Sequence, residues 1–312
     1  RRPSLYPTSQ ACAADGPLRD RREALLRLAF SIVRQTANLV RTGALWPRRL
    51  CLAFDGITGQ GISARSQRRI AMSELPAIPL VDARDGGLLR HASEGRDRAL
   101  GLRDACVGWF PPGAQTLMPF FDGVARRWLM RSKSPYVEEI GAIAGALGFP
   151  GIWFLNGSYQ WSCTALAREE GGAPWLARTL DWPFPGLGRF VELVRMRGPA
   201  GEFINVTWPG YVGALTALAP GRFAAAINQG PLRRRFHGKV ARLYDVAANA
   251  ITTLRHERSI PPDQLLRQVF EQARDYGEAR QILETTPVAR PVIYTLAGCR
   301  PGERCVIERT EG

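Results

Sequence analysis

The hydrophobic period of the chain changes at residues 148–151, and this change constrains the fold more than any other feature. The Gly-Phe-Pro-Gly sequence at this point stops a helical pattern of apolar residues. After it, short segments alternate apolar and polar residues and are separated by hairpin-like linkers, which is typical of antiparallel strands. Two expected helices and two final strands follow. The pattern predicts layered packing of helices against the faces of a sheet.

The chain of 312 residues is long enough for one large domain or two moderate ones. No run reaches the roughly eighteen apolar residues that a membrane-spanning helix needs. The expected helices are residues 20–41, 89–107, 115–130, 136–147, 240–256 and 263–276. The expected strands are residues 163–168, 174–180, 190–197, 202–208, 213–217, 223–228, 291–296 and 304–308.

Basic residues exceed acidic ones by 42 to 28, which gives a formal net charge of +14. The expected helix 20–41 is basic and amphipathic, and such a helix could contact an anionic membrane surface. No zinc-finger, RNP-like or basic-zipper pattern accompanies the charge, so no nucleic-acid partner is expected. The first residues lack a charged segment followed by an apolar one. Any signal peptide is therefore absent or not included in this sequence, and a cytoplasmic location is favoured.

The composition argues against metal and nucleotide chemistry. Six cysteines lack paired CxxC spacing, and the three histidines His91, His237 and His256 stand far apart. Neither pattern is typical of a zinc site. No Gly-rich phosphate-binding loop of a common form is present. The sequence therefore predicts no cofactor.

Aromatic residues concentrate between residues 151 and 212. Such a cluster forms either part of the core or the wall of an apolar pocket, and composition alone favours core. The candidates for an acyl-binding pocket are Trp161, Trp182, Phe184, Trp208 and Tyr211.

One pair of expected strands brings reactive groups together. If residues 169–172 close a four-residue hairpin, Cys163 lies opposite Arg178, and Asp181 lies just past the strand end. An arginine beside a thiol stabilises the thiolate, and a nearby carboxylate can orient a donor. The alternative is a buried cysteine beside an ordinary surface pair of Arg178 and Asp181.

The residues around this cysteine resemble a known signature. Cys-Thr at 163–164, followed by Ala-Arg-Thr-Leu-Asp-Trp at 177–182, is similar to the motif of the choloylglycine hydrolase and acid ceramidase-like N-terminal nucleophile hydrolases. Further patches resemble the acid ceramidase and N-acylethanolamine acid amidase branch. They are residues 79–82, 153–156, 226–229 and 296–309, so the resemblance covers roughly residues 75 to 310 in order.

The resemblance implies an α+β fold, a four-layer αββα sandwich with a mainly helical amino-terminal half. It also implies self-cleavage between Ser162 and Cys163, giving chains of residues 1–162 and 163–312 that together form one globular unit. In that assignment Cys163 attacks the amide, and its freed α-amine, with a pKa of about 8, serves as general base. Asp181 holds the amine, Arg178 supports the thiolate or the substrate, and Asn228 binds the amine or the oxyanion.

The sequence departs from the family pattern in places. Cys299 stands where the family usually carries an oxyanion-hole asparagine, and a thiol is a poor amide replacement. Ala177 replaces a glycine before Arg178. Arg309 matches a terminal arginine of the family and is a candidate for binding a substrate carboxylate or for supporting the site, with a surface salt bridge as the alternative.

The function implied by the resemblance is hydrolysis of linear amide bonds in N-acyl amides with a fatty or bulky apolar acyl group. One alternative is activity like that of bile-salt hydrolases or penicillin V acylases. The other is a non-catalytic protein that binds a ligand with the same fold. The expected partners are the N-acyl amide, the second processed chain and, through the basic helix, a membrane surface.

Overall fold

The computed structural model describes residues 77–109, 113–158, 162–181, 186–231 and 258–311, with the short pieces 235, 245, 248–249 and 251–252. The chain divides into two compact units, residues 1–69 with 234–247 and residues 70–233 with 248–312. Nearly all described residues belong to the second unit, which contains the Ser162–Cys163 bond. The expected helix 20–41, and most of the expected helix 240–256, lie outside the described residues.

Between residues 77 and 158, the described residues form helices and one short strand. The expected helix 89–107 is two helices, because the chain turns at Gly95, whose amide binds the His91 carbonyl. The expected helix 136–147 is confirmed; it carries Glu138 and Glu139 in its first turn and ends at a left-handed glycine, Gly148. The elements are β1 (Leu80–Asp82), α2 (Gly87–Glu94), α3 (Arg96–Val107), η3 (Ala114–Leu117), α4 (Met118–Leu129), α5 (Val137–Leu147) and α6 (Ile152–Gly157).

A seven-stranded sheet forms the centre of the unit, in the order β1-β4-β5-β6-β7-β8-β9. Strand β1 pairs in parallel with β4, and every other pairing is antiparallel. The strands after β1 are β4 (Glu192–Gly198), β5 (Gly201–Thr207), β6 (Thr216–Ala219), β7 (Phe223–Gln229), β8 (Val292–Ala297) and β9 (Arg304–Arg309). A separate two-stranded hairpin consists of β2 (Ser162–Glu170) and β3 (Ala173–Asp181).

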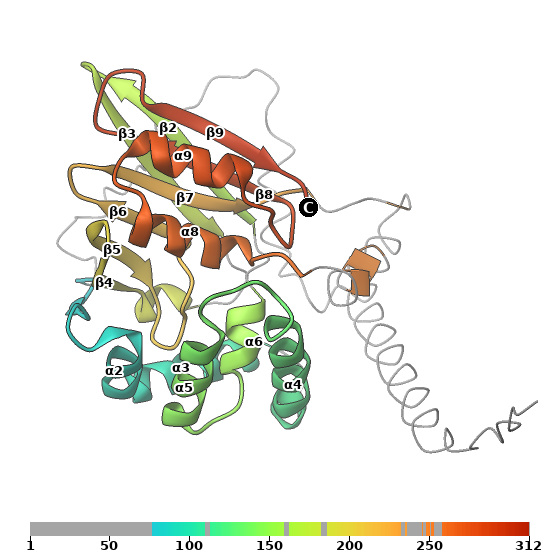
Figure 1. Cartoon of the computed structure of the whole chain (residues 1–312). Helices are drawn as coiled ribbons and strands as arrows, with labels where there is room; N and C mark the ends of the chain where they lie inside the picture. Colours follow the sequence, from blue (N-terminus) through green and yellow to red (C-terminus); the bar gives the residue numbers. More distant parts are fainter. Residues whose placement is uncertain are drawn as a thin grey trace, which may run out of the picture. The chain divides into compact units, whose positions relative to one another are not determined.

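The two faces of the sheet are covered differently (Figure 1). Helices α8 (Pro262–Gln272) and α9 (Tyr276–Thr285) pack on one face. There the rings of Phe203 and Phe223 stack on Phe270 of α8, with centroid distances of 5.6 and 4.8 Å. The β2–β3 hairpin packs on the other face, against β7, β8 and β9. The described part of the chain is therefore a mixed α/β fold with a helical layer and two β layers.

The expected strand 213–217 and the expected helix 263–276 are wrong in their bounds. Residues 213–215 are not a strand, because Asn205 and Asp263 bind their backbone: the Gly213 carbonyl accepts from Asn205, and Ala214 donates to the Asp263 carbonyl. The expected helix 263–276 ends at Gln272, and α9 begins after Asp275, whose carboxylate accepts the Glu278 amide. This Asp-x-x-Glu sequence is a capping signal that the periodicity analysis missed.

Candidate active site

The hairpin that carries Cys163 has a different register from the predicted one. Its loop is two residues, Gly171 and Gly172, both with positive φ (59° and 81°), as a tight primed turn requires. Cys163 therefore pairs with Leu180, and Arg178 pairs with Ala165. The predicted register was wrong by two positions. A shift of two keeps every side chain on the same face, so Cys163 and Arg178 are diagonal neighbours.

Arg178 makes the contact with Cys163 that the hairpin predicted. Its Nη2 donates to the Cys163 Sγ at 3.1 Å and to the Ile227 carbonyl at 3.0 Å. Its Nη1 donates to the Thr216 Oγ1 at 2.8 Å. Hydrogen bonds to β6 and β7 thus hold the guanidinium in place beside the sulfur. A positive charge at that distance favours the thiolate form of a cysteine.

The other predicted catalytic residues lie near this pair in the fold. Ser162 and Asp181 pair with each other at the open end of the hairpin, and the structure describes their backbone only. Asn228 is half-buried in β7, next to Ile227. Because Phe223 faces α8, the alternation along β7 directs Asn228 toward the hairpin side. Trp161, Trp182 and Phe184 lie outside the described residues.

A cavity of about 270 Å³ adjoins Arg178 between the hairpin and the sheet. Trp208, one of the predicted pocket residues, lines it and is almost fully buried. Tyr211 lies outside it, in the core, where its hydroxyl donates to Asp263 at 2.7 Å. Most residues that line this cavity were not predicted from the sequence. The alternation along β3 could have identified Leu176 and Leu180, which lie on the same face as Arg178. The lining residues are Leu176, Arg178, Leu180, Val191, Val206, Thr207, Trp208 and Thr216.

The structure contradicts the oxyanion prediction for Cys299. This residue is exposed in the turn between β8 and β9, and its amide donates to Glu303. The same turn binds Glu169, which accepts from the Gly302 amide at 2.7 Å. Glu169 is six residues along β2 from Cys163, about 20 Å at roughly 3.3 Å per residue. Cys299 was predicted as a site residue from the order of the family-like motifs along the chain. The β8–β9 turn instead contacts the hairpin at the end away from Cys163.

The structure also places Arg309 away from the site. Arg309 pairs with Val292, and this row of residues faces the helices, as Tyr294 does when it binds the Pro262 carbonyl. The Arg309 Nη1 donates to the Leu283 carbonyl at 2.6 Å, in the last turn of α9. A cation there stabilises the carboxyl end of the helix. Arg309 therefore lies on the opposite face of the sheet from Cys163, and the prediction that it binds substrate was wrong.

The helical face holds a buried acid that the sequence analysis did not identify. Asp263 at the start of α8 is fully buried, and burial raises its pKa to about 6. The hydrogen bond from Tyr211 and the charge of Arg290 act in the opposite direction. Asp263 lies in the helical layer, so it serves the packing of α8 rather than the cysteine.

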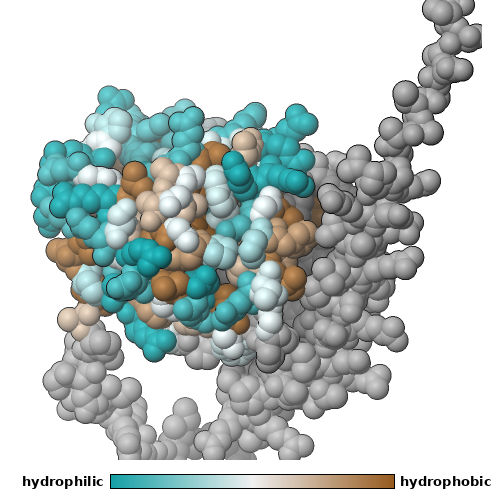
Figure 2. All heavy atoms as spheres, turned by 90° about the horizontal axis from the view of Figure 1, so that it is seen from below, coloured by the Kyte–Doolittle hydropathy of each residue, from teal (hydrophilic) through white to brown (hydrophobic). Residues whose placement is uncertain are grey.

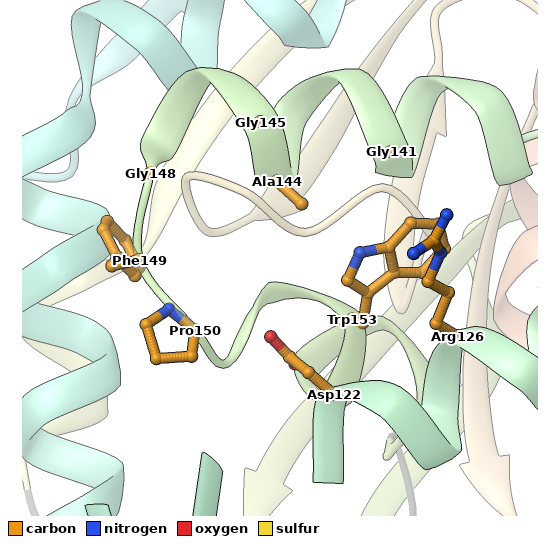
Figure 3. Close-up of a pocket in the computed structure, with 9 residues that line it drawn as sticks. All are labelled: Asp122, Arg126, Gly141, Ala144, Gly145, Gly148, Phe149, Pro150 and Trp153. Carbon is orange, nitrogen blue, oxygen red and sulfur yellow. The ribbon is translucent and has the colours of Figure 1, made fainter. Parts of the chain in front are cut away.

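A second hollow, of about 440 Å³, lies among helices α4, α5 and α6 (Figure 3). Its polar groups support the fold: Asp122 accepts the Gly151 and Phe154 amides at the start of α6, and Arg126 lies over the Trp153 ring. In the view onto this end of the molecule, apolar residues appear in separate places among hydrophilic ones (Figure 2). No residue that lines this hollow lines the cavity beside Arg178.

The described residues carry neither a metal-binding group nor a membrane-spanning helix. In these parts of the chain, no group of three or more His, Cys, Asp or Glu side chains is arranged to hold a metal ion. No helix within the same ranges is long and apolar enough to cross a membrane.

Known proteins resemble this chain over most of its length. It is 25% identical over 256 residues to the N-acylethanolamine-hydrolyzing acid amidase of Cavia porcellus, covering 78% of this chain and 64% of that protein. It is 31% identical over 223 residues to the acid ceramidase of Heterocephalus glaber, covering 65% of this chain and 54% of that protein. The chain thus spans between about half and two thirds of the length of these relatives.

A solved structure of a Caenorhabditis elegans N-acylethanolamine-hydrolyzing acid amidase ortholog aligns with 47% of this chain and 59% of that one. The identity is 21% and the TM-score is 0.38. No protein-family model matches the chain. The curated sequence matches confirm the resemblance found in the motifs: the chain is similar in sequence to N-acylethanolamine-hydrolyzing acid amidases and acid ceramidases.

Proposed function

We propose that the chain is a cysteine-dependent amidohydrolase that cleaves N-acyl amides with an apolar acyl group. The observation that carries this proposal is the 3.1 Å contact between Arg178 Nη2 and Cys163 Sγ beside a mostly apolar cavity. A nucleophile, a charge that favours its reactive form and a space for an apolar chain are then adjacent. The names of the relatives, an acid amidase that hydrolyses N-acylethanolamines and an acid ceramidase, support the same chemistry.

Activation in this proposal is cleavage of the Ser162–Cys163 bond. These are the first two residues of β2, so cleavage would leave Cys163 at the start of an ordered strand with a free α-amine. Such an amine has a pKa near 8 and can act as a general base without a histidine. Asp181, at the strand end opposite Ser162, holds the amine in this assignment.

The reaction then proceeds in two steps. The Cys163 sulfur attacks the amide carbonyl carbon, the carbon–nitrogen bond breaks, and the leaving amine takes a proton from the α-ammonium group. The α-amine next deprotonates a water molecule, which attacks the thioester and releases the acid. Arg178 stabilises the thiolate, Asn228 donates to the amine or the oxyanion, and the cavity lined by Trp208 holds the acyl chain.

The complete architecture in this proposal is the four-layer αββα sandwich. The helices α8 and α9, the seven-stranded sheet and the hairpin supply three layers, and a fourth would cover the outer face of the hairpin. Leu166 on that face is 52% exposed among the described residues, which supports a further covering layer. The two processed chains remain together in this assignment because residues before and after Cys163 share one core, for example Ile140 and Leu265.

Peripheral membrane contact through the basic segment 20–41, for which the sequence predicts an amphipathic helix, belongs to the same proposal. The test is sedimentation with anionic phospholipid vesicles, before and after deletion of residues 1–45. Binding that is unchanged by the deletion contradicts a role for this segment.

Hydrolysis by the purified protein tests the catalytic proposal. Release of ethanolamine from N-acylethanolamines is measured for the wild-type protein and for Cys163→Ala, with Cys106→Ala as a matched control. We expect Cys163→Ala to lose activity at least 1000-fold, because the variant lacks the nucleophile. Only the residual rate that substrate binding and oxyanion stabilisation provide would remain. Activity retained in Cys163→Ala rules out the mechanism. A wild-type chain that binds the amides without cleaving them favours the ligand-binding alternative.

A further inference from the structure

We propose that the cavity beside Arg178, the residue that contacts Cys163, restricts the acyl group to a medium-length chain of about eight to ten carbons, and that Leu176 sets this limit. The inference rests on the proposed function and narrows it to a substrate class. It is carried by the size of the cavity, by the chemistry of its wall and by the place of Leu176 on β3.

The volume limits the length of the chain. A cavity of about 150 Å³ in another protein holds benzene, so each heavy atom needs roughly 25 to 30 Å³. At that value the 270 Å³ beside Arg178 holds about ten heavy atoms. A longer saturated chain has to leave its end outside the cavity.

The wall favours a hydrocarbon chain without a charged end. Leucine, valine and tryptophan side chains form most of it, and Arg178 is the one charged residue among the described residues of the lining. The guanidinium of Arg178 is turned to Cys163, Thr216 and the Ile227 carbonyl. The far part of the cavity therefore offers apolar contact.

Leu176 marks the far part of the β3 wall. Leu180 pairs with Cys163, Arg178 follows on the same face, and Leu176 follows again. Leu176 is four positions along the strand from Leu180, about 13 Å at roughly 3.3 Å per residue. An acyl chain that starts at the sulfur and runs along β3 meets Leu176 last.

A series of N-acylethanolamines from acetyl to palmitoyl tests the length limit. Each substrate is used below its aggregation concentration, as checked by light scattering. We expect kcat/KM to rise up to about fourfold per methylene, the equivalent of about 0.8 kcal/mol, and to reach a maximum at octanoyl or decanoyl. We expect palmitoyl to lie at least tenfold below the maximum.

Variants of Leu176 test the residue itself. Leu176→Phe and the bulkier Leu176→Trp should move the maximum to hexanoyl or shorter, and Leu176→Ala should move it to dodecanoyl or longer. Leu166→Ala is the matched control, because Leu166 belongs to the same hairpin but faces away from the cavity. It should leave the length profile unchanged. If the bulkiest variant does not fold, Leu176→Phe and Leu176→Ala still give opposite shifts.

The outcomes separate this inference from the proposed function. A kcat/KM that still rises from decanoyl to palmitoyl overturns the length limit and leaves the amidohydrolase proposal standing. An unchanged profile in all three Leu176 variants overturns the role of Leu176. A protein that hydrolyses no amide of any length overturns the proposed function and this inference together.

Discussion

The two faces of the seven-stranded sheet are covered in different ways. On the helical face, α8 and α9 cover the strands, and polar side chains there bind one another: Tyr211 binds Asp263, and Arg267 binds Glu271 at 2.8 Å. On the other face, a two-stranded hairpin packs on β7, β8 and β9, and a cavity remains toward β5 and β6. A thin covering layer leaves space for a substrate next to a reactive side chain. The helical face serves stability.

Arg178 and Arg309 illustrate the difference between the two faces of the sheet. Arg178 reaches from the hairpin to a sulfur, a hydroxyl and a carbonyl at the edge of the cavity. Arg309 reaches from β9 to a carbonyl at the end of α9. The sequence predicts both arginines as site residues. They lie on opposite faces of the sheet, and only Arg178 contacts Cys163.

The largest expected difference is in kcat/KM between the variants Arg178→Met and Arg309→Met. Loss of the group that stabilises the thiolate should lower kcat/KM by about 100-fold or more, as removal of one transition-state donor does. Arg309→Met should leave kcat/KM within about twofold and lower the free energy of unfolding by about 1 kcal/mol, the contribution of a cation at a helix end. Steady-state kinetics and thermal unfolding of both variants check this. Equal losses of activity would contradict the assignment of the two faces.

The next contrast is the pH dependence of stability on the helical face. Burial raises the pKa of Asp263 to about 6, so the folded protein holds a proton that the unfolded chain releases near pH 4. The stability that this proton contributes is full below about pH 4 and is lost as the pH rises to about 6. Asp263→Asn removes this dependence.

Denaturant unfolding between pH 4 and 8 measures this effect. From pH 4 to pH 7, the wild-type protein should lose roughly 2 to 3 kcal/mol relative to Asp263→Asn. Asparagine can still accept the hydrogen bond from Tyr211. Parallel pH profiles of the two proteins would show that Asp263 titrates normally.

The smallest expected effect concerns Cys299. Cys299→Ser should leave kcat/KM within about twofold, because the residue is exposed in the β8–β9 turn and only its backbone amide binds Glu303. A loss of activity above tenfold in Cys299→Ser would mean that this turn reaches the reacting atoms.

The sequence predicted the part of the site that depends on local alternation. Cys163 and Arg178 meet because both lie on the inner face of one hairpin, and that face survives an error of two in the register. The register depends on the loop length: the sequence predicts a four-residue loop at residues 169–172, whereas the loop consists of Gly171 and Gly172. Most strands follow the predicted ranges for the same reason, since alternation is visible in the sequence.

The rest depended on contacts between distant segments. Cys299 and Arg309 were placed by their order along the chain, whereas the fold brings the β8–β9 turn to Glu169 and Arg309 to α9. The cavity wall combines β3 with Val191, Val206 and Thr216, and no local pattern joins these residues. Asp263 carries no signal of burial in its own sequence neighbourhood.

The most direct test of the account is the intact mass and amino-terminal sequence of the purified protein, after incubation from mildly acidic to neutral pH. Self-cleavage by Cys163 predicts two chains with a new amino terminus at Cys163 in the wild-type protein, and a single 34.5 kDa chain in Cys163→Ala. A wild-type protein that hydrolyses N-acyl amides as a single uncleaved chain would contradict the α-amine of Cys163 as the general base.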